Sequence, residues 1–276
     1  MTSPPLLEAR NLRKTFSAPS GALANSASRS GGADGNGVAA VDGVSLELAA
    51  GETLAIVGES GSGKTTLARM LLRLIEPDSG ELLVEGRDFL AARGAELRAL
   101  RREMQMVFQD PFASLDPRMR VGLIVGEPLE IHEPKLGRAE RRSRVIEVLR
   151  ATGLAEDTLA RYPHEFSGGQ RQRIGIARAL VLRPRLVVAD EPVSALDVSV
   201  GAQILDLLQK LQRDFSLTYL LISHSLPVVA QLATRIAVMQ GGRIVETGAA
   251  EQVLRAPAHP YTQSLIAAIP SLPASI

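Results

Sequence analysis

A glycine-rich run, GESGSGKT at residues 58–65, contains the residue types best suited to chemistry on phosphates. Glycines allow backbone N–H groups to converge on phosphate oxygens, where a Cβ would obstruct the approach. The spacing predicts that Lys64 reaches the β- and γ-phosphates of a nucleotide and that the Thr65 hydroxyl ligates Mg²⁺. A chance turn is the alternative, but the run lies between a strand-like and a helix-like segment. The predicted nucleotide site comprises Gly58, Glu59, Ser60, Gly61, Ser62, Gly63, Lys64, Thr65 and Thr66.

Two adjacent carboxylates, Asp190 and Glu191, follow the apolar run RLVVA. A buried strand that ends there would place both at its carboxyl end, where ligands bind in open α/β sheets. We expect Asp190 to hold Mg²⁺ and Glu191 to polarise the water that attacks the γ-phosphate. His224 ends the next apolar run at the same sheet edge. Taken by themselves, the two acids could be a solvated strand end, and His224 could have a purely structural role. The upstream phosphate loop favours a role in hydrolysis for all three.

The elements that position these residues can be predicted from hydrophobic patterning. Short apolar runs at 53–58, 185–190 and 217–223 predict strands buried on both faces, and helical patterns lie between them. This alternation predicts an α/β core with a parallel sheet. Residues 6–16 predict an edge strand, and residues 38–52, with alternating apolar residues and a turn, predict an antiparallel strand pair. Together these two segments would form an N-terminal antiparallel β subdomain.

Two further segments interrupt this core. Residues 17–38 are rich in Ser, Gly and Ala, and such a stretch buries too little apolar surface to offset its ordering entropy, so we expect a mobile loop. Residues from about 116 to 165 are mostly helical in pattern and highly charged, which predicts an inserted helical subdomain. Its arginines could form a basic patch, but the glutamates among them favour a solvated helix face.

The overall composition excludes several function classes. The net charge of +1 predicts no nucleic-acid partner, and the absence of cysteine excludes disulfides and thiolate metal sites. The N-terminus has no basic leader followed by an apolar stretch, so a secretory signal is not expected. No apolar run approaches the ~20 residues that a membrane-spanning helix needs. We therefore expect the chain to reach a membrane only by docking onto a partner that spans it.

The run FSGGQRQR at residues 166–173 resembles the signature sequence of ABC ATPases. Its small residues precede a helical stretch and would offer a hydroxyl group, bare amides and a helix N-terminus to phosphate, although an ordinary serine N-cap is the alternative. The resemblance implies that the signature of one subunit closes over ATP held by the other. The signature residues are Ser167, Gly168, Gly169 and Gln170.

The resemblance to ABC ATPases implies roles for further residues. Gln109 matches the glutamine that senses Mg²⁺ and touches the membrane partner, which makes Thr65, Gln109 and Asp190 the implied metal-site residues. Asp197, in SALD, matches the loop that connects the two nucleotide sites, and Phe16 is the candidate for stacking on adenine. Ser225 stands after the histidine where the family usually has Asp, and we expect little loss from this. The implied catalytic residues are Lys64, Gln109, Glu191 and His224.

Longer strings, among them RAPAHPYTQSLIAAIP, resemble the ATPases of bacterial oligopeptide and dipeptide importers, of the second-ATPase type. The resemblance implies an ATPase domain at 6–254 and an importer-type tail at 255–276. It also implies ATP-driven peptide import at the cytoplasmic face of the inner membrane. The implied partners are a second ATPase subunit in a heterodimer, two transmembrane permeases and a periplasmic or extracellular solute-binding protein. Nickel, glutathione or another small solute is the alternative cargo, and a soluble ABC ATPase without a transport role is the competing class.

Overall fold

The computed structural model describes residues 4–17, 37–110 and 114–268. The mobile loop predicted for residues 17–38 lies outside this part of the chain except at its ends. There, Ser17 and residues 37–38 belong to strands. The prediction was therefore wrong at both ends of the segment, where the strands extend further than the apolar pattern indicated.

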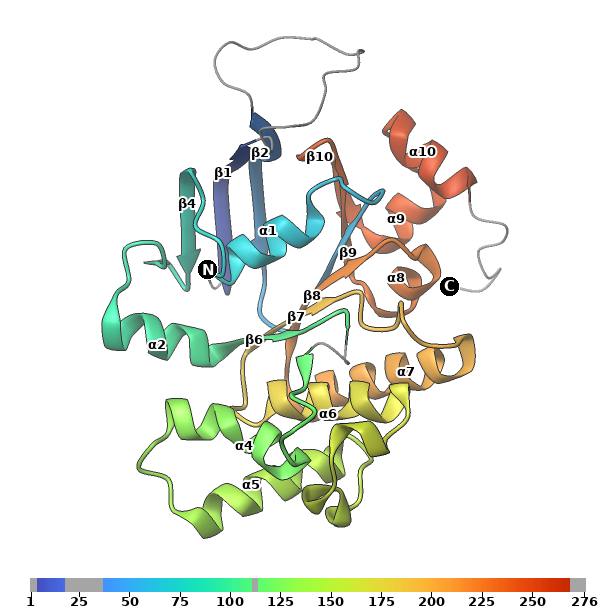
Figure 1. Ribbon diagram of the computed structural model, residues 1–276. Helices are drawn as coiled ribbons and strands as arrows, with labels where there is room; N and C mark the ends of the chain where they lie inside the picture. Colours follow the sequence, from blue (N-terminus) through green and yellow to red (C-terminus); the bar gives the residue numbers. More distant parts are fainter. Residues whose placement is uncertain (1–3, 18–36, 111–113, 269–276) are drawn as a thin grey trace.

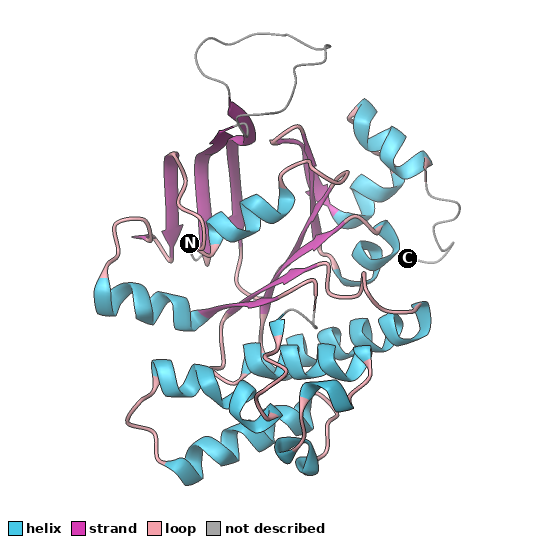
Figure 2. Ribbon diagram, in the orientation of Figure 1, coloured by secondary structure: helices cyan, strands magenta, loops and turns pink. Residues whose placement is uncertain are grey.

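In the described residues the strands form two sheets, which Figures 1 and 2 show side by side. The smaller sheet has the order β2-β1-β4-β5 and the larger one the order β10-β9-β3-β8-β7-β6. The strands of the smaller sheet are β1 (Leu7–Ser17), β2 (Gly37–Leu48), β4 (Ser79–Val84) and β5 (Arg87–Asp88). Those of the larger sheet are β3 (Thr53–Val57), β6 (Met104–Val107), β7 (Leu186–Asp190), β8 (Thr218–Ser223), β9 (Arg235–Gln240) and β10 (Arg243–Ala249).

The larger sheet confirms the predicted parallel α/β core. Strands β6, β7, β8, β3 and β9 pair in parallel, and only β10 joins in the antiparallel direction among the described strands. Every residue of β3, β7 and β8 is buried, as continuous apolar runs predict for strands covered on both faces. The parallel pairing brings the carboxyl ends of β6, β7, β8 and β3 to one edge, where the candidate site lies.

The smaller sheet corrects two predictions. β1 is not an edge strand, because it pairs with β2 on one side and β4 on the other. Residues 38–52 do not form a strand pair, since β2 is one long strand and the turn after it leads into the larger sheet. Gly43, with a φ of 70°, absorbs an irregularity in β2 without reversing the chain.

The helices of the α/β core flank the sheets, and a second group packs together below the larger sheet (Figure 1). The first group is α1 (Lys64–Leu71), α2 (Gly94–Glu103), α7 (Val198–Phe215), α8 (Leu226–Leu232), α9 (Ala250–Arg255) and α10 (Pro260–Ala267). The second is α4 (Val121–His132), α5 (Arg138–Ala151) and α6 (Gly168–Leu180), with 3₁₀ turns at Glu156–Ala160 and Pro163–Glu165. Along the described residues, no helix combines the length and apolar character that crossing a membrane requires.

Four arginines of α5, namely Arg141, Arg142, Arg144 and Arg150, lie in ion pairs. Arg141 pairs with Glu130 at 2.6 Å, and Arg144 pairs with Glu133 at 2.9 Å. Arg142 is largely exposed and pairs with Glu156. This pattern is that of a solvated helix face and not of a basic patch that recruits an anionic partner.

Candidate functional site

The glycine-rich loop connects β3 to α1, so its backbone starts at the carboxyl end of a buried strand and ends at a helix N-terminus. Gly58 has a φ of 152° and Gly63 a φ of 104°. A Cβ on Gly58 would lie 2.1 Å from the carbonyl oxygen of Met239, and one on Gly63 would lie 2.1 Å from the carbonyl oxygen of Ala40. Because backbone carbonyls cannot swing aside, only glycine fits these two positions.

Lys64 lies inside this loop and is only 6% exposed. Its ammonium donates hydrogen bonds to the carbonyl oxygens of Gly58 at 2.8 Å and Glu59 at 2.7 Å. Burial lowers the pKa of Lys64, while the neighbouring carboxylates Glu191 and Asp190 oppose that shift. The loop therefore encloses a positive charge with glycine backbone around it, an arrangement that suits the phosphates of a nucleotide.

Asp190 ends β7 and is almost fully buried, at 3% exposed. It accepts a hydrogen bond from the Thr65 hydroxyl at 3.3 Å. Burial raises the pKa of Asp190, while the hydrogen bond from Thr65 opposes that shift. No cluster of three or more His, Cys, Asp or Glu residues that could hold a metal occurs within the described ranges. A single carboxylate beside a hydroxyl group fits Mg²⁺, which usually keeps waters and phosphate oxygens among its ligands.

The Glu191 carboxylate contacts two other residues of the predicted site, His224 and Gln109. Its Oε1 lies 2.8 Å from Nδ1 of His224, and its Oε2 accepts a hydrogen bond from Nε2 of Gln109 at 3.2 Å. Its backbone has a φ of 45°, which is uncommon for a non-glycine residue, and its N–H donates to Ile222 O on β8 at 2.8 Å. The Glu191 side chain is 15% exposed and that of His224 is 56% exposed. A fixed carboxylate at the surface between two hydrogen-bonding partners can orient and polarise a water molecule.

Comparison with known proteins decides the family. A family model described as "ABC transporter" matches residues 41–194. The dipeptide transport ATP-binding protein DppF of Lactococcus lactis is 54% identical to this chain over 84% of its length and 75% of the relative's. The oligopeptide transport ATP-binding protein OppF of Escherichia coli is 51% identical over 84% of this chain and 69% of the relative's. The chain belongs to the ABC ATPases.

Two further comparisons agree with membership of the ABC ATPases. A solved dimeric ATP-binding cassette, bound to ADP and phosphate, is 29% identical with a TM-score of 0.75, and the match covers 88% of this chain and 98% of the cassette. A family model of the C-terminal region of oligopeptide and dipeptide transporters matches residues 245–275. Membership of the ABC ATPases makes ATP the nucleotide and ATP hydrolysis the activity of this chain.

The signature sequence of this ABC ATPase begins α6. Ser167 is the N-cap, and it forms a reciprocal capping box with Gln170, so the alternative of an ordinary serine cap also describes the local structure. A Cβ on Gly169 would lie 2.3 Å from Cγ1 of Val200, and one on Gly168 would lie 3.3 Å from Cδ2 of Leu196. The glycines thus let the signature pack closely against the start of α7.

Asp197 is the N-cap of α7. Its carboxylate accepts hydrogen bonds from the backbone N–H of Val200 at 2.9 Å and from the Ser199 hydroxyl at 2.7 Å. The hydrogen bond from Val200, followed by that from Ser199, lowers the pKa of Asp197. The signature and the connecting loop therefore form one packed unit in this ABC ATPase. Figure 1 shows α6 below the larger sheet, whereas the phosphate loop lies above it, and the structure does not bring these two predicted groups together in one subunit.

Phe16 is placed near the end of β1, opposite Val38 on β2. Its ring is partly exposed, and the Lys14 ammonium lies 5.8 Å from the ring centroid. Its stacking on adenine stays a prediction.

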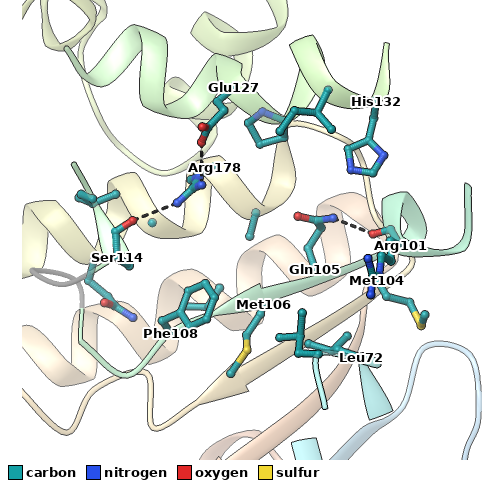
Figure 3. Close-up of a pocket in the computed structure, with 18 residues that line it drawn as sticks. Leu72, Arg101, Met104, Gln105, Met106, Phe108, Ser114, Glu127, His132 and Arg178 are labelled. Carbon is teal, nitrogen blue, oxygen red and sulfur yellow. Dashed lines mark hydrogen bonds and ion pairs between the residues drawn. The ribbon is translucent and has the colours of Figure 1, made fainter. Parts of the chain in front are cut away.

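The sequence patterns did not reveal a groove that is lined by Phe108, beside Gln109 in the chain, and lies between β6 and the helices below it (Figure 3). The groove has a volume of about 270 Å³. Arg178 lies on one wall, where it donates to the Ser114 carbonyl at 3.0 Å and to Glu127 at 2.7 Å. Exposed large apolar side chains line it, namely Leu74, Phe108 and Ile131. No periodicity in the sequence would have shown this groove, because its walls come from separate elements.

Proposed function

We propose that this ABC ATPase powers the import of peptides through a transporter in the bacterial inner membrane and works at the cytoplasmic face of that membrane. The observation that carries the proposal is the match of residues 245–275 to the C-terminal region of oligopeptide and dipeptide transporters. The relatives from L. lactis and E. coli are named for dipeptide and oligopeptide transport. This supports peptides as the cargo over nickel, glutathione or another small solute.

ATP would bind with its phosphates in the loop at residues 58–65. Lys64 would neutralise the β- and γ-phosphates, and the loop amides would donate hydrogen bonds to their oxygens. Thr65 and Asp190, with Gln109 nearby, would hold Mg²⁺, which supplies positive charge where phosphoryl transfer develops negative charge. Their hydroxyl, carboxylate and amide oxygens are the donor types that Mg²⁺ prefers.

Glu191 would hold and polarise the attacking water. The hydrogen bonds from His224 and Gln109 fix the carboxylate, so little reorganisation is needed when the water is deprotonated. Because His224 is also exposed, its ring can contact the γ-phosphate from the open side of the site. Positioning and charge stabilisation account for most of the catalysis in phosphoryl transfer.

A complete site would need a second ATPase subunit, in a heterodimer. The signature helix offers a capped N-terminus and exposed polar groups, but in this chain it lies away from its own phosphate loop. Two subunits arranged head to tail would each close their signature over ATP held by the other. Asp197 lies between Leu196 and Val200, the residues that face the signature glycines, and would connect the two sites.

The groove beside Gln109 would receive a membrane permease. It combines exposed apolar side chains with the charged pair Arg178 and Glu127 on its wall (Figure 3). Such a surface suits a short amphipathic helix from a partner. Movement of the partner would then reach the site through the strand that leads to Gln109. The groove also favours the transporter over a soluble ABC ATPase.

The test is purification of the tagged chain from native membranes in mild detergent, with co-purifying proteins identified by mass spectrometry. We expect two permeases, a second ATPase and a solute-binding protein, whose ligand would name the cargo. Ile131→Glu, in the groove, should abolish recovery of the permeases. The matched control is Leu123→Glu, an exposed apolar residue on the same helix that lies outside the groove. Recovery of the chain without any membrane partner would refute the transport role.

A further inference from the structure

The C-terminal segment that begins at residue 255 is anchored to the ATPase core by Glu246 on β10. The Glu246 carboxylate accepts hydrogen bonds from the backbone N–H groups of Ala258 at 2.8 Å and His259 at 3.0 Å. His259 is in turn the N-cap of α10, because its Nδ1 accepts a hydrogen bond from the N–H of Tyr261 at 3.2 Å. The start of α10 therefore has a fixed position relative to the larger sheet.

This anchoring places Tyr261 against the phosphate loop. The Tyr261 hydroxyl oxygen accepts a hydrogen bond from the backbone N–H of Glu59 at 3.0 Å, between residues that are 202 positions apart. The Tyr261 ring is half-buried and packs against the hydrophobic core. Figure 1 shows the connection from β3 to α1 reaching toward the side of the molecule where α9 and α10 lie.

The backbone of Glu59 is consequently held on both sides of its Cα, through its own N–H and its own carbonyl group. Its N–H donates to Tyr261, and its carbonyl oxygen accepts from the Lys64 ammonium at 2.7 Å. Rotation of the backbone at Glu59 would break both hydrogen bonds. The orientation of this part of the loop, and with it the position of the Lys64 ammonium, thus depends on a hydroxyl group in the C-terminal segment.

We propose that Tyr261 is a positioning residue for nucleotide binding, which holds the Glu59 backbone so that the loop is preorganised for the phosphates of ATP. The inference rests on the proposed role of residues 58–65 as the phosphate site. A preorganised loop binds more tightly because less conformational freedom is lost on binding. The hydroxyl group touches neither Glu191 nor His224 in the structure, so its removal should weaken binding and leave the hydrolytic step unchanged.

The test compares Tyr261→Phe with the wild-type chain, using titration with a fluorescent ATP analogue in the presence of Mg²⁺, steady-state hydrolysis and thermal unfolding. One neutral hydrogen bond corresponds to a rise of about two- to tenfold in the dissociation constant and in KM. We expect that rise with kcat within about twofold, because the chemical groups are untouched. Glu246→Ala, which releases the anchored segment, should raise KM similarly. Tyr162→Phe is the matched control, since it removes a hydroxyl group from a half-buried ring elsewhere.

Amide hydrogen exchange gives a direct second measurement. The Glu59 N–H should exchange faster in Tyr261→Phe, and its exchange should be unaltered in Tyr162→Phe. An unchanged KM and unchanged Glu59 exchange in Tyr261→Phe would overturn the proposal, as would a lower melting temperature alone. The variant Lys64→Ala distinguishes a failure of the proposal for Tyr261 from a failure of the proposed phosphate site. If Lys64→Ala abolishes nucleotide binding, the site stands whatever Tyr261 does, and if binding persists, the site and the inference both fail.

Discussion

Replacement of Gly63 by alanine should damage the phosphate loop more than replacement of Gly61, although both glycines have positive φ angles. A Cβ on Gly63 would lie 2.1 Å from the carbonyl oxygen of Ala40, whereas no atom lies within 4 Å of a Cβ on Gly61. Left-handed backbone costs an alanine about 1–2 kcal/mol, and overpacking adds about 1–3 kcal/mol. The free energy of unfolding should therefore fall by about 2–5 kcal/mol for Gly63→Ala and about 1–2 kcal/mol for Gly61→Ala.

Urea unfolding followed by circular dichroism measures the change in the free energy of unfolding for each variant. Titration with an ATP analogue measures the effect of each substitution on nucleotide binding. Because Gly63 is the N-cap of α1, relief of the overlap must move the start of that helix and the loop together. We expect Gly63→Ala to lose nucleotide binding and Gly61→Ala to keep more of it. Equal losses of stability in the two variants would contradict this prediction, since only the Cβ on Gly63 would overlap neighbouring atoms, those of Ala40 and Met239.

Two further predictions concern the residues around Glu191 and the signature. His224→Ala removes the partner 2.8 Å from the Glu191 carboxylate, so steady-state hydrolysis should fall by about 100-fold or more while ATP binding changes little; hydrolysis near the wild-type rate would contradict its role. Gly169→Ala places a methyl group 2.3 Å from Val200 and should lower the free energy of unfolding by about 1–3 kcal/mol. Val200→Ala in the same chain should restore much of that loss in a double-mutant cycle, and simple additivity would exclude the contact as the cause.

The α/β core could be predicted from the sequence because β3, β7 and β8 are continuous apolar runs. Parallel strands bring their carboxyl ends to one edge, so the proximity of Asp190, Glu191 and His224 also followed from the pattern. Gln109 could be assigned only through the family resemblance. Nothing in the local sequence indicates that β6 lies beside β7, which is the pairing that brings Gln109 to Glu191.

The two wrong predictions for the smaller sheet, those for β1 and for residues 38–52, have a physical cause of their own. Alternating apolar residues in β1 indicate which face is buried, but they do not indicate whether one strand or two pair with its edges. In β2, Gly43 is a residue type typical of turns. The antiparallel pairing with β1 nevertheless continues on both sides of Gly43, with a shifted register. Turn-forming residues can therefore mark an irregular strand as well as a chain reversal.

Contacts across long sequence separations could not be predicted at all. The tail was recognised as characteristic of peptide importers, but its Tyr261 contacts Glu59 across 202 positions, and only the folded chain shows this. The same holds for the two carbonyl groups that restrict Gly58 and Gly63, which come from β9 and β2. The sequence predicts a glycine requirement there from phosphate binding, whereas the structure adds a second requirement from packing.

Glu191 is the residue that we propose to activate water when this chain hydrolyses ATP. The most direct measurement compares Glu191→Gln with the wild-type chain in ATP binding and in steady-state ATP hydrolysis. Glutamine has the same shape and still offers an oxygen to His224 or Gln109, but it cannot accept a proton from water. We expect Glu191→Gln to bind ATP with wild-type affinity and to hydrolyse it about 100-fold or more slowly. Unimpaired hydrolysis by Glu191→Gln would contradict the role proposed for Glu191.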